Sequence, residues 1–305
     1  MFKKSSFKVL GLLATLALAI VLSACGNGGS GSSSDGNTSL GKKDVNIPYI
    51  ASDNSTPRSL VIAEVLKKAG YNVTTTPIQA SGPLYASVSQ DSDSFHASGI
   101  FPSTDKSFYN KFKSNLTVYD KKNLVDNVKV GLAVPKYEQV IDSISDLNSK
   151  KSTTSSNTGN SSNSFGKSVD WTIQGTDARN GVMKQTKSEL DDGQLDKYSL
   201  KESSDQDQFK TIQKAYKQQK PIVFTAMEPS WFSKELDIKM SKDPEKIYGK
   251  DDEHINLVFN KNFKDDKEKL AKKIFKDNKN PEDVAKDYVD DHDTKVDKWL
   301  KGIDH

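Results

Sequence analysis

The strongest constraint on the fold is a regular alternation of strand-like and helix-like segments that begins at Val45. Short apolar runs at 45–50, 72–78 and 95–101 have the length and composition of strands. The first two are separated by residues 56–70, in which apolar side chains recur at helical spacing. Strands that alternate with helices in this way predict an α/β fold with mostly parallel strand pairing.

The helix expected at 56–70 also carries signals for its two ends. Thr56 is a good N-cap, Pro57 suits the first helical position, and Gly70 follows the last turn. The alternation then continues along the chain. The other expected elements are strands at 128–135, 171–175, 198–202, 221–227 and 255–259, helices at 178–190 and 207–219, and charged amphipathic helices within 265–302.

The N-terminus has the features of a secretory signal. Three lysines precede an apolar run over 9–22, which is too short to be a durable membrane span and leads through Ser-Ala to Cys25. A lone cysteine here resembles a lipobox, in which the thiol receives two acyl chains, enough for stable anchoring. We therefore expect residues 1–24 to be a lipoprotein signal peptide and Cys25 to anchor the protein to the membrane. The alternative is an ordinary signal with an incidental cysteine.

Charge and cysteine content exclude several classes of function. The formal net charge is +3, and removal of the three lysines of the signal leaves no net side-chain charge. No basic patch therefore predicts binding to nucleic acid. With Cys25 acylated, no thiol remains for a disulfide, for thiolate catalysis or for metal ligation.

Composition divides the rest of the chain. Residues 25–43 are rich in Gly, Ser and Asn, and we expect a flexible tether. Residues 148–168 are rich in Ser, Asn and Thr, which predicts a disordered surface insertion. The body after the tether, roughly 265 residues, is long enough for one large domain or two lobes.

No catalytic or metal-binding pattern is present in the sequence. The four histidines lack zinc-helix spacing, and there is no nucleophile elbow, P-loop or dinucleotide fingerprint. The run Asp-Asp-His-Asp at 290–293 is typical of a solvated charged helix face rather than of a metal cluster. We therefore expect no enzyme activity, no cofactor and no metal.

A binding role fits the sequence better. Helices are expected to begin just after strands near Thr56 and near Asp177–Ala178, and their free N–H groups and positive dipole ends suit a carboxylate. Lobed α/β sheets bind ligands at the carboxyl ends of their strands. The residues expected at that rim, at the ends of two strands, are Ile100, Phe101, Met227, Glu228 and Trp231.

Six segments carry a resemblance to a known family. They are residues 84–105, 128–137, 143–147, 175–183, 215–232 and 242–255. In order and spacing these segments resemble the substrate-binding lipoproteins of glycine betaine/proline betaine ABC importers, over about 45–300. The resemblance implies an α/β fold, the bilobed type II periplasmic-binding-protein clamshell with two crossovers. Lobe I would comprise residues 44–130 and 226–305, and lobe II residues 131–225.

The resemblance also implies how a ligand is held. In that family backbone amides hold a carboxylate, and a cage of tryptophans holds a quaternary ammonium through cation–π attraction. Met227 and Ile100 fall on two cage positions, and the turn formed by Ser52, Asp53 and Asn54 falls on a third, so three expected cage positions carry no aromatic side chain. Trp231 falls on a further tryptophan of the motif, whose role we expect to be more structural.

Acidic side chains near these positions suggest a different cation. Asp53, Asp177 and Glu228 could accept hydrogen bonds from an ammonium that carries N–H, which a trimethylammonium lacks. Arg179, beside Ala178, could pair with a ligand carboxylate. Each of these charges could instead be an exposed side chain or a helix cap. Tyr49, Tyr85 and Trp171 could rebuild part of a cage, although core packing is their ordinary role.

Together these features predict a solute-binding component of an ABC importer on the outer face of the cytoplasmic membrane of a Gram-positive cell. It would capture a small zwitterion or amine in a cleft between lobes and deliver it to the permease, and it would bind glycine betaine only weakly. The alternative is a ligand sensor or a surface adhesion lipoprotein that has a degenerate pocket and no transporter.

Overall fold

The computed structural model describes residues 44–51, 55–68, 70–150, 164–230, 233, 236–249, 253–263 and 270. The strands are β1 (Asp44–Ile50), β2 (Asn72–Ile78), β3 (Phe95–Phe101), β4 (Leu116–Val118), β5 (Val125–Pro135), β6 (Thr172–Gln174), β7 (Ser199–Lys201), β8 (Val223–Glu228), β9 (Ile238–Met240) and β10 (Glu253–Asn260). The helices are α1 (Ser55–Lys68), α2 (Ser81–Gln90), α3 (Lys106–Phe112), α4 (Asp146–Ser149), α5 (Phe165–Ser168), α6 (Gly181–Asp192) and α7 (Asp205–Lys217).

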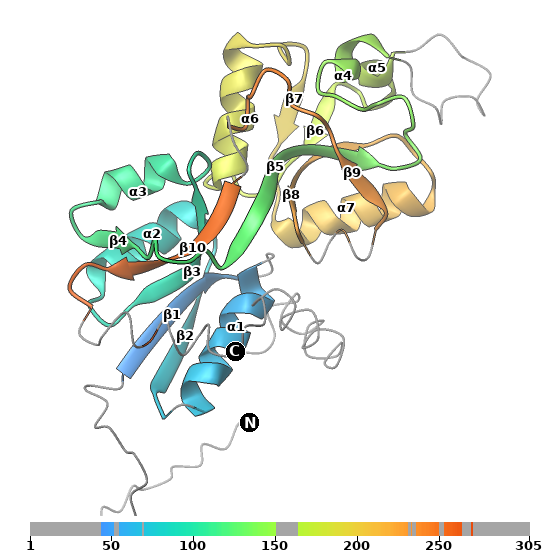
Figure 1. Ribbon diagram of the computed structural model, residues 1–305. Coiled ribbons are helices and arrows are strands. Elements are labelled where there is room, and N and C mark those ends of the chain that lie inside the picture. The colour runs from blue at the N-terminus through green and yellow to red at the C-terminus, as the bar shows by residue number, and fades with distance from the viewer. Residues whose placement is uncertain are drawn as a thin grey trace, which may run out of the picture. The chain divides into compact units, whose positions relative to one another are not determined.

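Strand β5 connects two sections of one sheet (Figure 1). Its N-terminal end pairs with β10, which also pairs with β3 and β4, and we call this group the first section. Its C-terminal end pairs with β8 and β9, and β8 continues to β6 and β7 to form the second section. A separate parallel pair, β1 and β2, adjoins β3 through a bridge between Asn46 and Ser94.

The expectation of mostly parallel pairing is wrong. Among the described strands only β1–β2, β6–β7 and β6–β8 are parallel, and the pairings of β10 and β5 are all antiparallel. The long-range return of β10 accounts for the antiparallel pairings with β3, β4 and β5, and β5 adds two more by pairing with β8 and β9. Alternation along the chain indicates that strands and helices follow each other, but it carries no information about where a distant strand inserts.

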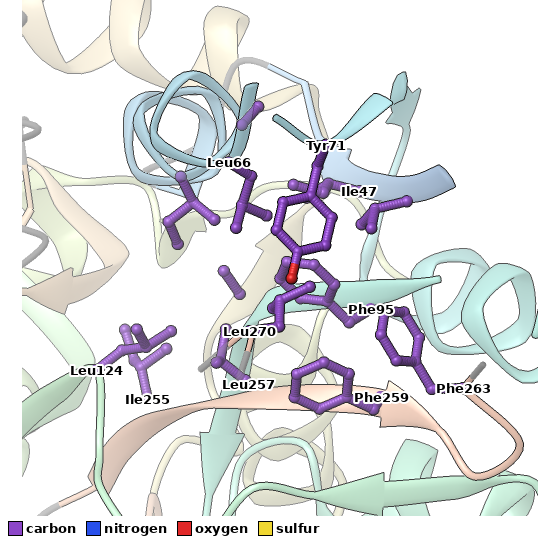
Figure 2. Close-up of a cluster of buried hydrophobic side chains, with 14 of the residues drawn as sticks. Ile47, Leu66, Tyr71, Phe95, Leu124, Ile255, Leu257, Phe259, Phe263 and Leu270 are labelled. Atoms are coloured by element: carbon purple, nitrogen blue, oxygen red, sulfur yellow. The ribbon is translucent and has the colours of Figure 1, made fainter. Parts of the chain in front are cut away.

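The first section buries apolar side chains on both of its faces. On one face Ile255, Leu257 and Phe259 of β10 pack with Phe95 and with Leu66 of α1 (Figure 2). On the other face Val258 packs with side chains of α2 and α3. Successive strand residues point to opposite faces, so the run from Ile255 to Phe259 supplies both layers.

The second section is built in the same way. Leu132 and Val134 of β5 and Val223 of β8 contribute to one cluster, which also contains Phe165. Ala133 and Phe224, one residue out of phase, contribute to a cluster that includes Ile212 of α7.

Two expected boundaries need correction. Residues from 226 onward were expected in lobe I, but Leu236, Ile238 and Tyr248 pack in the clusters of the second section, so the chain returns to the first section only after Tyr248. Residues 148–168 were expected to be a disordered insertion, but the ends of that range belong to α4 and α5, and Phe165 is fully buried. The middle of that range, 151–163, lies outside the described residues. The polar composition of this range gave no sign that one aromatic side chain, Phe165, is buried in the core.

Several expectations lie outside the described residues. These are the signal peptide, Cys25, the tether and, apart from Leu270, the charged helices of 265–302. Leu270 is helical and fully buried in the core cluster of the first section. No helix among the described residues is long and apolar enough to cross a membrane.

Candidate functional site

A cavity of about 120 Å³ lies where the two sections meet. Residues next to or within the first section, including Arg58, Ser98 and Asp105, line one side. Residues of the second section and its helices, including Asn180 and Gln208, line the other. The lining mixes aliphatic and polar groups, which is the usual character of a site for a small molecule.

Several helices direct their N-termini at this cavity. Ser81, Gly181 and Asp205 are the first residues of α2, α6 and α7, Arg58 lies in the first turn of α1, and all four line the cavity. Helix N-termini carry unsatisfied N–H groups and a partial positive charge. The cavity wall is therefore favourable to a carboxylate.

The start of α6 differs from the expectation. We placed it near Asp177–Ala178, but α6 begins at Gly181, after the N-cap Asn180. The side chain of Asn180 makes no capping bond to α6. Its Nδ2 donates to Thr176 Oγ1 at 3.1 Å, and its Oδ1 accepts from Ser81 N and Ser81 Oγ at 3.1 and 3.3 Å. The side chain of the N-cap Asn180 therefore does not bind the first amides of α6. Gly181 and Val182, the first two residues of that helix, line the cavity.

Three charged side chains line the cavity among the described residues: Arg58, Asp105 and Asp205. Arg58 is 1% exposed, and its Nη1 donates to Ala97 O at 2.9 Å. Asp105 is also 1% exposed, and its Oδ2 accepts from Ile100 N at 3.1 Å and from Tyr85 Oη at 3.2 Å. Burial, and then the charge of Asp105, raises the pKa of Tyr85, so the phenol stays protonated and remains a donor.

The two sides of the cavity are in close contact at its edge. Gly82 N donates to Arg179 O at 3.3 Å, and the Lys184 ammonium lies 3.8 Å from the centre of the Phe108 ring. A Cβ atom on Gly181 would lie 2.5 Å from Thr104 O, closer than real Cβ contacts. The structure is therefore a closed arrangement that requires glycine at position 181.

The structure brings two of the expected rim residues into the cavity wall. Ile100, near the end of β3, and Met227, near the end of β8, both line it. Phe101 instead packs edge-to-face on Tyr109, at 5.7 Å between ring centres. Glu228 lies in register with Lys129 on β5 and is not among the lining residues.

Asp177 and Arg179 form a pair with each other outside the enclosed cavity. Arg179 Nη2 donates to Asp177 Oδ2 at 2.6 Å and to Gln79 Oε1 at 3.0 Å. The guanidinium lowers the pKa of Asp177. Together with Ala178, these two residues line a shallow surface depression.

The other expected site residues are divided between the core and the part of the chain that is not described. Tyr49 and Tyr85 are buried, Trp171 packs edge-to-face on Tyr198, and none of the three lines the cavity. The residues outside the described part are Ser52, Asp53, Asn54 and Trp231. Among the described residues, no group of three or more His, Cys, Asp or Glu side chains could hold a metal ion.

Sequence reasoning missed most of the polar lining. Asp105 and Asn180 lie inside segments that carried the resemblance, yet neither was singled out. Arg58 lies in the first turn of a helix whose start was expected at the site, which was a usable signal. Gln208 lies on α7 and had no local signal at all.

An α/β fold that encloses a small cavity between two sheet sections defines a solute-binding protein of the type II periplasmic class. A family model described as the substrate-binding domain of ABC-type glycine betaine transport systems (OpuAC) matches residues 43–291. The chain belongs to this family.

Individual relatives agree with the family match. The lactococcal OpuAC crystal structure, closed and complexed with glycine betaine, superimposes with a TM-score of 0.64 at 25% identity, covering 85% of this chain and 99% of that one. The glycine betaine/L-proline-binding protein ProX of Borrelia burgdorferi gives 0.62 at 21% identity, covering 86% and 100%, and supports the fold. The glycine betaine/carnitine transport binding protein GbuC of Listeria monocytogenes is 31% identical over 46% of this chain, and the match spans about half of that relative (52%).

Proposed function

We propose that this protein is the extracytoplasmic solute-binding component of an ABC importer and that the cavity captures a small zwitterion. The observation that carries the proposal is the cavity of about 120 Å³ that is lined by the first residues of several helices. This volume is below the ~300 Å³ at the lower end of drug-sized pockets. The occupant is therefore a small molecule rather than a peptide or an oligosaccharide.

The carboxylate of the zwitterion has two partners in the wall. The first is the N-terminus of α6, whose first two residues, Gly181 and Val182, line the cavity. The second is the guanidinium of Arg58, whose fork of donors can bind a carboxylate in addition to Ala97 O. Both lie away from water, where such bonds are stronger than at the surface.

A ligand panel tests the binding role. Thermal shift and isothermal titration with glycine betaine, carnitine, choline, proline and common amino acids should reveal at least one that raises the melting temperature by mass action. Arg58→Gln should weaken that ligand, whereas Lys187→Gln, on the exposed face of α6, should not. If no zwitterion stabilises the protein at millimolar concentration, the proposal fails.

We also propose that Cys25 is lipidated and holds the protein on the outer face of the cytoplasmic membrane, where it meets its permease. The support is the lipobox-like sequence before Cys25. Cys25→Ser should release the protein from membranes or block its processing, as measured by fractionation and by mass of the mature N-terminus. Ser33→Ala, in the tether, is the control. A Cys25→Ser variant that stays in the detergent-extracted membrane fraction contradicts the anchor.

A further inference from the structure

The cavity has aliphatic side chains at two positions where a cage for a quaternary ammonium would place aromatic rings, and charged and amide groups lie elsewhere in its wall. Among the described lining residues there is no Phe, Tyr or Trp. Two positions where the family resemblance implies tryptophan are Ile100 and Met227, and both line the cavity. An isoleucine has no ring, and a thioether has no quadrupole, so neither attracts a trimethylammonium as an indole does.

Hydrogen-bond acceptors surround the same space. Asp105 enters from the first section and Asp205 from the start of α7. Gln208 Nε2 donates to Gln174 O, Thr225 O and Thr225 Oγ1, each at 3.0 Å, so its amide oxygen is the atom left to accept. Asp105 Oδ2 accepts from Ile100 N at 3.1 Å and from Tyr85 Oη at 3.2 Å, and a carboxylate accepts hydrogen bonds through both of its oxygens.

Ser98 is a second and independent sign of a ligand. This side chain is 8% exposed and, like Ile100, lines the cavity from β3. Its Oγ is buried and has no hydrogen-bond partner. A buried hydroxyl without a partner destabilises the protein, and a polar group of a bound ligand removes that cost.

The charges agree with this chemistry. With one guanidinium and two carboxylates, the described wall carries one more negative than positive side chain. The guanidinium and the helix N-termini suit the carboxylate of a zwitterion. The two aspartates suit its cationic end, provided that this end carries N–H donors. A trimethylammonium has none, and its methyl groups would separate the aspartate oxygens from the charge.

We propose that the cavity selects a zwitterion whose ammonium carries N–H, an amino or imino acid, over its fully N-methylated analogue, with Asp105 and Asp205 as acceptors. This rests on the proposed solute-binding function and specifies its substrate class. The selectivity arises from hydrogen bonds that each N-methylation removes. Affinity should therefore fall stepwise with the number of methyl groups.

The test is an N-methylation series measured by isothermal titration on the full mature chain. Glycine, sarcosine, N,N-dimethylglycine and glycine betaine share one carboxylate, and proline with proline betaine repeats the comparison at larger volume. We expect the N–H-bearing member of each series to bind at least about 10-fold more tightly than the trimethylated or dimethylated end member. Tighter binding of both betaines overturns the inference while leaving the proposed function intact.

Variants assign the effect to the aspartates. Asp205→Asn should weaken binding of the N–H-bearing ligand at least about 10-fold and reduce the difference in affinity between members of the series. Asp105→Asn should act in the same direction. Because Asp105 also accepts from Tyr85 Oη, the affinity of that variant is compared only if its melting temperature is retained. The control is Asp191→Asn, on the exposed side of α6, which should change nothing. An unchanged series in Asp205→Asn contradicts the assignment.

A third series separates the two levels of the proposal. Ethanolamine and choline offer the same change from N–H to N-methyl without a carboxylate. If ethanolamine binds but no zwitterion does, the proposal that the cavity recognises N–H donors stands, and the proposal that its ligand is a zwitterion is refuted. If no member of any series binds, the substrate class is refuted, and the solute-binding function is refuted as well only if no zwitterion of the wider panel raises the melting temperature.

Discussion

The aromatic core of the first section and the cavity beside it use side chains in opposite ways. In the core, Phe95 stacks on Phe259 at 5.0 Å, and Phe263 packs edge-on against Phe259 at 5.1 Å (Figure 2). In the cavity, no described lining residue is aromatic, and charged and amide groups converge instead. The chain has 13 Phe, 10 Tyr and 3 Trp, so the difference is one of placement and not of supply. Aromatic content alone therefore says nothing about the ligand.

The largest expected effect separates the core from the cavity. Phe259→Ala removes a fully buried ring from the stacked cluster and should lower the free energy of unfolding by about 3–5 kcal/mol. Ligand affinity, measured well below the melting temperature, should stay within about twofold. Urea denaturation checks the first value, with Val140→Ala at an exposed site as the control. A large loss of affinity would show that the two regions are not independent.

The next effect concerns His96, which lies on β3 between core and cavity. Burial lowers the pKa of His96 to about 3 from its ordinary 6.5, and its Nδ1 accepts from Ser98 N at 3.3 Å. The unfolded chain therefore takes up a proton near pH 6.5, whereas the folded chain does so only near pH 3. Stability should fall as the pH drops through this window, by at most about 1.4 kcal/mol per pH unit.

Chemical denaturation at pH 7, 6, 5 and 4 measures this slope. His96→Gln should remove most of the histidine contribution, whereas His254→Gln, at a partly exposed position on β10, should leave the slope close to that of the wild type. If stability depends on pH equally in the wild type and in His96→Gln, then the folded protein protonates His96 over the same pH range as the unfolded chain does.

Gly181→Ala should act on the cavity alone. The new Cβ would approach Thr104 O to 2.5 Å, so the two sides of the cavity could not close as they do here. We expect ligand affinity to fall about 10-fold, or ~1.4 kcal/mol, because the bound conformation becomes strained. The unliganded melting temperature should change little, and Ser188→Ala, exposed on the same helix, is the control. Wild-type affinity in Gly181→Ala would show that closure does not need this contact.

The smallest effect tests whether an aromatic wall can be restored. Met227→Trp places an indole beside the cavity and should shift the preference between glycine betaine and sarcosine toward betaine by about 0.5–1 kcal/mol. Met227→Leu keeps the volume without a ring and should leave the preference unchanged. The measurement is the titration of glycine betaine and sarcosine into both variants. If both variants change the preference between the two ligands equally, the effect comes from side-chain volume and not from the ring.

Local signals predicted the elements better than their assembly. The strands expected at 72–78 and 95–101 have the observed bounds, because their β-branched and apolar residues are bounded by turn residues. Helix α2 was not predicted, because Ser, Gly and Pro are poor helix formers. Burial of Leu84, Tyr85 and Val88 stabilises it instead.

For the site too, local signals predicted single residues better than the way these residues come together. Ile100 and Met227 were found because the family resemblance fixed two strand ends. Arg58, Asp105 and Gln208 come from distant parts of the chain and meet only in the folded cavity. No window of sequence contains that convergence, so their common location had to be read from the structure.

The contacts of Asn180 with Ser81 and of Arg179 O with Gly82 N join the two sides of the cavity, so we expect them to influence how long a solute stays bound. Opening the cavity must break them, and at about 0.5–1.5 kcal/mol each they add up to a few kcal/mol. Affinity differences of this kind appear mainly in dissociation rates and not in association rates. We therefore expect slow spontaneous release, so that a permease would speed delivery of the solute by separating these few hydrogen bonds at the edge of α6.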